Sequence, residues 1–150
     1  LEWLEQDLEA NPDTATIIAT HYPAIPIPDR LRHPGLNDGG CLGNGDELLA
    51  LLRKYPQVFA IFAGHVHLHF IEQTEGITHV TTGALPEYPT EYRDIHVHDD
   101  RLEIRTLGLS DSSFAARSLI PGKDWTAGEP RDRMATIALP GALVPQPTRR

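Results

Sequence analysis

The sequence predicts an α/β fold in which helices flank a largely buried mixed sheet. Residues 14–20 and 58–63 are short, almost continuously apolar and rich in β-branched or aromatic side chains. This composition is typical of strands that are buried on both faces. Residues 1–10 and 45–55 instead repeat leucine at helical spacing, as amphipathic helices do. Strands that alternate with helices in this way favour an α/β domain.

Length and composition exclude several function classes. A chain of 150 residues is one domain at most. Its net charge of −8 and the lack of a basic patch argue against nucleic acid as a partner. No apolar stretch is long enough to form a membrane helix, so we expect no membrane partner. Cys41 is the only cysteine, and no secretory signal precedes the first helix, so we expect a cytoplasmic protein.

The first two elements bring a histidine to the end of a buried strand. The helix of residues 1–10 stops at residues 11–13, which contain Asn and Pro. The strand of residues 14–20 follows and ends at His21. Open α/β sheets bind their ligands at the carboxyl ends of strands. Taken alone, His21 is still more often a structural histidine than a ligand.

A long loop and a second helix come next. Residues 24–43 are rich in Pro, Gly and Asp, and loops of this length usually form functional rims or lids. Asn44 is expected to cap the helix of residues 45–55, with Glu47 completing a capping box.

The most informative stretch is residues 60–70, AIFAGHVHLHF. Gly64 marks a bend after the apolar run, and His65, His67 and His69 then occupy every second position. In an extended strand, alternate side chains share a face and repeat about every 6.6 Å. His65 and His67 could therefore converge on two metal ions about 3.5–4 Å apart. The alternative is three histidines on the solvated face of a strand.

Two further pairs of segments complete the predicted sheet. A turn at residues 75–76 leads into a strand at residues 77–82. Residues 93–98 and 102–105 then alternate apolar and polar side chains across an Asp-rich turn, which predicts a hairpin.

The hairpin strand of residues 93–98 carries a second pair of histidines. Its alternation places Ile95 and Val97 on the inward face. We interpret His96 and His98 as a solvated face, because this strand is polar and alternating instead of fully buried.

Two motifs resemble those of the calcineurin-like metallophosphoesterases. Thr20-His21-Tyr22-Pro23 is similar to the family's strand-end histidine, and Gly64-His65-Val66-His67 is similar to its Gly-His-x-His motif. The stretches CLGNGDELLALLRKYPQVFAIFAGHVH and TTGALPEYPTEYRDIHVHDD resemble the cyclic-nucleotide phosphodiesterase-like branch. The resemblance covers about residues 1–107. It implies the C-terminal part of an α/β-β/α sandwich, with a mixed sheet and flanking helices.

The resemblance also implies a function. Such enzymes hydrolyse phosphomonoesters or phosphodiesters with a metal-bound hydroxide. Two divalent ions of the Mn, Fe or Zn type would be the cofactors, and a small phosphoester, such as a nucleotide, the substrate. His21 and His65 would bind one ion and His67 the other, while His69 would support them or serve the structure. No catalytic residue other than these ligands is assigned.

None of the family's earlier motifs, which are Asp-x-His, Gly-Asp-x-x-Asp and Gly-Asn-His-Asp/Glu, precedes His21 in this chain. We therefore expect residues 1–108 to be the C-terminal half of the domain, inactive on its own, with the missing N-terminal half as its partner. A start at Leu1 without a preceding cap favours a piece of a longer protein. Residues 109–150 would be a partly irregular extension, in which residues 134–139 pack or pair and residues 140–150 are mobile.

Two other interpretations remain open. The segment from His65 to Ile71 also matches the His-φ-His-φ-His-φ-φ motif of the histidine triad hydrolases, where φ is apolar. In that family His67 would be a nucleophile that attacks a nucleotide phosphate without metal. Alternatively, the chain is a non-catalytic fragment that binds metal weakly.

Overall fold

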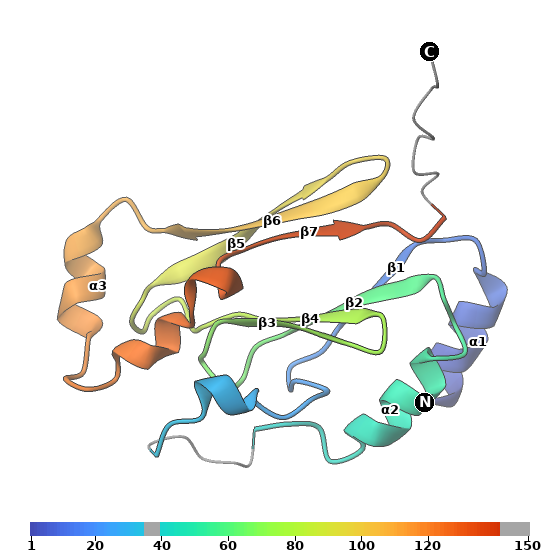
Figure 1. Cartoon of the computed structure of the whole chain (residues 1–150), viewed down its shortest axis with the longest axis horizontal. Coiled ribbons are helices and arrows are strands. Elements are labelled where there is room, and N and C mark those ends of the chain that lie inside the picture. Colours follow the sequence, from blue (N-terminus) through green and yellow to red (C-terminus); the bar gives the residue numbers. More distant parts are fainter. Residues whose placement is uncertain (35–39, 142–150) are drawn as a thin grey trace.

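The computed structural model describes residues 1–34 and 40–141. They form three layers (Figure 1). Helices α1 (Glu2–Ala10) and α2 (Gly45–Leu52) cover one face of a four-stranded sheet, and a three-stranded sheet covers the other. Within the described ranges, no helix combines the length and the apolar character that crossing a membrane requires.

The four-stranded sheet is mixed, as predicted. It contains β1 (Thr16–Ala19), β2 (Val58–Ala63), β3 (Phe70–Thr74) and β4 (Ile77–Thr81). The order is β1-β2-β4-β3, in which β1, β2 and β4 are parallel and β3 is antiparallel to β4. The carboxyl ends of β1, β2 and β4 therefore meet at one edge of the sheet, where ligands bind in open α/β sheets.

Both predicted helices bury their leucine face against this sheet. Leu8 of α1 and Leu52 of α2 are each only 1% exposed. They pack with Ile61, Phe70 and Ile77 of the strands in one apolar cluster. The predicted capping box of α2 is wrong. Asn44 does occupy the N-cap position, but its backbone (φ −111°, ψ 29°) leaves the usual extended region and its side chain makes no capping bond.

The three-stranded sheet is antiparallel, in the order β5-β6-β7. Its strands are β5 (Glu91–Val97), β6 (Arg101–Gly108) and β7 (Met134–Ala138). The predicted hairpin is the β5–β6 pair. The core between the two sheets contains Phe59, Ala60, Val80, Leu102, Ile104 and Ile137.

Two apolar residues predicted to face inward are not covered. Ile95 and Val97 pair with Ile104 and Leu102, so they do share the inward face of the sheet. They are nevertheless 39% and 73% exposed. Both lie on β5, an edge strand of its sheet.

The C-terminal region joins both sheets. It contributes α3 (Ser112–Ser118), the short 3-10 helices η2 (Asp124–Ala127) and η3 (Pro130–Asp132), and β7. Residues 134–139 were expected to pack or pair, and β7 pairs with β6 along its whole length.

Of the loop predicted at residues 24–43, Asp29–Leu31 forms the 3-10 helix η1, and residues 35–39 lie outside the described ranges. The predicted mobility of residues 140–150 falls mostly on residues 142–150, which also lie outside them.

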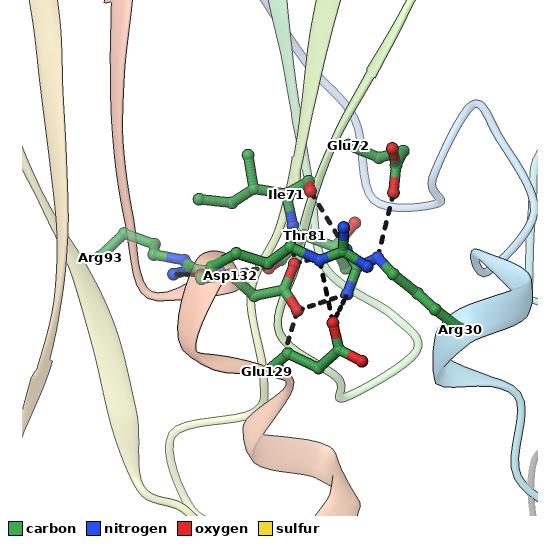
Figure 2. Close-up of polar contacts among 8 residues, drawn as sticks. Arg30, Ile71, Glu72, Thr81, Arg93, Glu129 and Asp132 are labelled. Atoms are coloured by element: carbon green, nitrogen blue, oxygen red, sulfur yellow. Dashed lines mark hydrogen bonds and ion pairs between the residues drawn. The ribbon is translucent and has the colours of Figure 1, made fainter.

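A buried carboxylate connects η1, β3 and η3 (Figure 2). Asp132 has no exposed surface and receives a two-pronged ion pair from Arg30, with N–O distances of 2.6 and 2.7 Å. Its oxygens also accept the backbone N–H groups of Ile71 (2.8 Å) and Glu129 (2.9 Å). Arg30 donates further bonds to Glu72 and Glu129. The hydrogen-bond acceptor positions of this carboxylate are therefore all used.

Hydrogen bonding keeps Asp132 charged in spite of its burial. Burial opposes ionisation, but the bonds from Arg30, Ile71 and Glu129 outweigh it and lower the pKa of the Asp132 carboxyl. Arg93 approaches from the other sheet and donates to the carbonyl oxygens of Asp132 (2.6 Å) and Thr81 (2.9 Å). Burial lowers the pKa of Arg93 to about 10. The network thus ties the two sheets to the loop that carries Arg30.

We expect Asp132→Ala to lower the free energy of unfolding by about 3–5 kcal/mol, because it leaves a largely buried guanidinium and two N–H groups without their acceptor. Urea denaturation at pH 7 measures this loss. Asp29→Ala is the matched control, since it removes the exposed partner of Arg32 on the same 3-10 helix. Equal effects of the two substitutions would contradict the role of Asp132.

A buried histidine in β4 predicts a pH dependence of stability. His79 is 2% exposed, and neither ring nitrogen has a partner among the described residues. Burial lowers its pKa from 6.5 to about 4, against a smaller opposing effect of Glu72. The unfolded chain therefore binds this proton at a higher pH than the folded chain does. The stability contributed by the neutral ring is complete above pH 6.5 and is lost as the pH falls toward 4.

We expect the free energy of unfolding to fall between pH 6.5 and 4, with His79 contributing on the order of 3 kcal/mol of the loss. His79→Leu should flatten this part of the profile, which urea titrations at half-unit pH intervals would measure. A profile as steep as that of the unsubstituted protein would show that His79 does not titrate in this range.

Candidate functional site

The chain bends sharply after β2, where an extended strand was predicted. β2 ends at Ala63, and His65 and His67 adopt left-handed backbone conformations with φ of 62° and 51°. The extended strand through His69 is therefore wrong. Residues other than glycine rarely adopt this conformation, and where it persists the surroundings must enforce it. The apolar residues between the histidines mimic a strand pattern, but the polypeptide turns at both histidines.

The bend brings His65 next to His21. β1 and β2 are parallel neighbours, so residues that follow them leave the sheet side by side. The Nδ1 atom of His65 lies 3.1 Å from the Nε2 atom of His21. The N–H of Gly64 donates to the carbonyl oxygen of His21 at 3.1 Å, which fixes the two backbones together. The ring of Tyr22 packs on His65 with centroids 3.8 Å apart.

The geometry of this pair fits two nitrogen ligands of one metal ion. Imidazole nitrogens that bind an ion at about 2.0–2.1 Å lie about 2.9–3.4 Å apart, depending on the coordination angle. The distance of 3.1 Å falls within this range, and it is also that of an N–H···N hydrogen bond. Neutral imidazole is a common ligand for Zn²⁺ and Fe²⁺. The pair could thus hold an ion from one side.

The third predicted ligand lies apart from the pair. Nδ1 of His67 is 3.1 Å from the Oε2 atom of Glu87, and both side chains are about half exposed. The Nζ atom of Lys123 is 3.8 Å from the same oxygen. Across residues 1–34 and 40–141, no three His, Cys, Asp or Glu side chains gather as a metal ion would require. The structure brings His21 and His65 together and leaves His67 with Glu87.

Sequence reasoning did not identify Glu87. This residue follows β4, the third strand whose carboxyl end reaches the same edge of the sheet as β1 and β2. Its position after a predicted strand could have identified Glu87 from the sequence, because acidic residues after parallel strands are candidates for binding roles. It was missed because the loop after residue 82 was expected only to end the strand.

His69 belongs to the core and not to the exposed site. Its side chain is completely buried, and Nδ1 accepts the N–H of Gly83 at 3.1 Å. Burial, together with the charges of Arg93 and Arg133, lowers its pKa to about 4. The nearest carboxylate oxygen to Nε2 belongs to Glu91, at 3.5 Å. His69 is therefore neutral at pH 7.

Two further interpretations of the histidines can now be compared with the structure. The histidine triad interpretation depends on three histidines that alternate along a strand, and residues 64–69 are not extended. The predicted solvated pair is confirmed for His96, which is exposed and lies 2.9 Å from Asp94. His98 is only partly exposed, and its buried Nε2 atom lies 3.6 Å from Glu103.

Several known proteins are similar to this chain. No protein-family model matches it. A 3',5'-cyclic-nucleotide phosphodiesterase of Nostoc sp. is 34% identical over 77 residues, which are 51% of this chain and 27% of the relative. A glycerophosphodiester phosphodiesterase of Enterobacter lignolyticus is 30% identical over 98 residues, which are 65% and 32% of the two chains. A probable glycerophosphodiester phosphodiesterase of Arcobacter nitrofigilis is 40% identical over 68 residues, or 45% and 23%.

A solved structure has a similar fold. The crystal structure of a dimetal phosphatase from Danio rerio superposes with a TM-score of 0.60 at 21% identity, covering 92% of this chain and 37% of that one. The chain is a partial match to the metallophosphoesterase and cyclic-nucleotide phosphodiesterase family. The predicted family and the predicted α/β fold class are confirmed. The chain spans about a quarter to a third of the length of the curated relatives it matches.

We expect His69 to carry its proton on Nε2 at pH 7 and to remain neutral at pH 5.5, because Nδ1 accepts a backbone N–H and burial disfavours the charged ring. Long-range ¹⁵N–¹H correlation spectra of the imidazoles distinguish the two tautomers and the charged form. An Nδ1–H tautomer, or a charged ring at pH 5.5, would contradict the assignment.

Proposed function

We propose that this chain supplies the histidine side of a metallophosphoesterase active site, in which His21 and His65 bind one divalent ion and His67 faces a second. The observation that carries the proposal is the 3.1 Å approach of His21 and His65 at the ends of two parallel strands. It is supported by the left-handed backbone at His65, since strained residues cluster at functional sites. The relatives named as phosphodiesterases support a small phosphodiester as substrate.

The protein groups would hold and orient the ligands. Two divalent ions of the Mn, Fe or Zn type, when bound, would stabilise charge on the phosphate oxygens and lower the pKa of water. The ring of Tyr22 packs on His65 and limits the orientation of that imidazole. The Oε2 atom of Glu87 lies 3.1 Å from Nδ1 of His67, and a carboxylate beside a histidine ligand helps to fix the orientation of its ring.

Three neutral imidazoles do not make a complete dinuclear centre. Two dications need carboxylates to bridge them and to balance their charge. We therefore propose that the remaining ligands come from another part of a longer protein and that the isolated 150-residue chain is inactive. The relatives are three to four times longer than the parts that match, which supports this view.

The uncovered surfaces of the sheets support the same proposal. β1 is an open edge strand, and a groove of about 490 Å³ beside it is lined by Trp3, Ile17 and Leu42 among others. Trp3 is 75% exposed and Ile17 is 40% exposed. Val97 of β5 is 73% exposed on the inward face of its sheet. Apolar surface on open sheet edges favours pairing with a further strand.

Metal binding by the purified 150-residue chain tests the ligand roles. We expect calorimetric titration with Mn²⁺ or Zn²⁺ to show binding that His21→Ala and His65→Ala each weaken about tenfold or more, since each removes a ligand. His96→Ala is the control, because it removes an exposed imidazole from β5. Circular dichroism verifies that each variant is folded. Equal weakening by all three substitutions would contradict the site.

Turnover distinguishes the proposed half-site from a complete enzyme. We expect the isolated chain to give no metal-dependent hydrolysis of bis-p-nitrophenyl phosphate above the uncatalysed rate. A longer natural protein that contains these residues should hydrolyse the diester, and His65→Ala should abolish that activity. Hydrolysis by the 150-residue chain that His67→Ala removes would show that the chain needs no further ligands. Activity that persists in the longer protein without His65 would exclude the metallophosphoesterase role.

A further inference from the structure

Residues 124–132 contact the bent segment, residues 64–69, that contains the three histidines. We call residues 124–132 the brace and residues 64–69 the histidine loop. The N–H of His69 donates to the carbonyl oxygen of Thr126 at 3.0 Å. Just past the histidine loop, the N–H of Ile71 donates to Asp132 at 2.8 Å. The brace therefore supplies acceptors to the backbone where the loop re-enters the sheet.

The backbone of the brace is in direct contact with the loop at Gly128. This residue has a φ of 69°, and a Cβ atom placed there would collide with the carbonyl oxygen of His69. It would also lie 3.2 Å from two atoms of the Asp132 side chain. Only glycine leaves the brace this close to the histidine loop, because both neighbours are fixed by hydrogen bonds.

The side chain of Thr126 also fixes the brace to the segment that follows β4. The hydroxyl group of Thr126 donates to the carbonyl oxygen of Tyr88 at 3.0 Å, and Thr126 is 2% exposed. Tyr88 follows Glu87, the partner of His67. Lys123, immediately before the brace, also lies near Glu87. The brace thus touches both the segment that carries His67 and the segment that carries its carboxylate.

The histidine loop is fixed at both ends. Gly64 bonds to the carbonyl oxygen of His21, and His69 bonds to Thr126. Between these points His65 and His67 keep left-handed conformations. Such conformations are unfavourable for residues other than glycine and persist only when surrounding contacts enforce them. A contact that fixes the second end therefore helps to set the direction of the imidazoles.

We propose that the brace, through Gly128 and Thr126, positions the histidine loop for metal binding, so that the C-terminal region belongs to the functional site. The inference rests on the proposed metal-binding function, because its purpose is the placement of His65 and His67. The residues of the brace touch neither metal nor substrate in this view. They are positioning residues.

A matched pair of glycine substitutions tests the proposal in the full 150-residue chain. Gly122 has a φ of 80°, and a Cβ atom placed there would have no atom of the described residues within 4 Å, whereas Gly128 faces the His69 carbonyl. Both substitutions place a Cβ atom at a positive φ, and only Gly128→Ala places it against the histidine loop. Gly128 also has a ψ of −168°, which residues other than glycine rarely tolerate, so the Thr126 variants control for the additional backbone strain. We expect Gly128→Ala to weaken Co²⁺ binding about tenfold and to change the visible spectrum of the Co²⁺ complex. Gly122→Ala should leave both unchanged.

A less disruptive pair of substitutions at Thr126 tests the proposal if the Gly128→Ala variant does not fold. Thr126→Val removes the hydroxyl group, which faces the carbonyl oxygens of Tyr88 and Lys123, with little change of shape, and Thr126→Ser retains that hydroxyl group. We expect Co²⁺ binding to weaken about threefold in Thr126→Val and to return to the original affinity in Thr126→Ser. Urea denaturation identifies the conditions under which each variant is folded, so that loss of stability is not mistaken for loss of affinity.

A metal-free measurement separates failure of this inference from failure of the proposed function. In ¹⁵N–¹H spectra without metal, Gly128→Ala should shift the signals of His65 and His67, and Gly122→Ala should not. Unchanged signals, or Co²⁺ affinity equal to that of the unsubstituted chain, would overturn the positioning role. If the unsubstituted chain binds no Co²⁺ while the signals still shift, the metal-binding function fails and the coupling of brace and loop stands.

Discussion

The buried ion pair between Arg30 and Asp132 is the interaction on which the arrangement of the domain depends. It joins the loop after His21, the start of β3 and the C-terminal 3-10 helix in one network (Figure 2). A carboxylate without any exposed surface is tolerated only when each of its acceptor positions is used, and here an arginine and two backbone N–H groups use them. The position of each of the three segments is therefore linked to that of the other two.

The site at the edge of the sheet follows from this scaffold together with strand direction. Parallel pairing places the ends of β1 and β2 side by side, which brings His21 and His65 within 3.1 Å. The left-handed turns at His65 and His67 then separate their two imidazoles. His65 meets His21, while His67 meets Glu87 from the loop after β4. Three parallel strands thus contribute to one edge, each through the residues that follow it.

Much of the fold was predictable because local patterns agreed with it. The apolar run at residues 58–63 and the leucine spacing at residues 45–55 each specify one element, and both elements form. The approach of His21 to His65 could be anticipated, because each histidine follows a predicted buried strand. The bend at His65 could not, because alternation of polar and apolar residues also describes an extended strand, and the contacts that enforce the bend come from Thr126 and Gly128, far along the chain.

The same limit applies to the C-terminal region, whose role its own sequence does not disclose. Asp132 is one acidic residue among many, and its burial depends on Arg30, which is 102 positions earlier. During synthesis on a ribosome, that arginine emerges long before its partner. The Arg30–Asp132 ion pair cannot form until nearly all of the described chain has left the exit tunnel. A product released before residue 124 would keep Arg30 hydrated and expose the unpaired edge of β6 to other nascent chains.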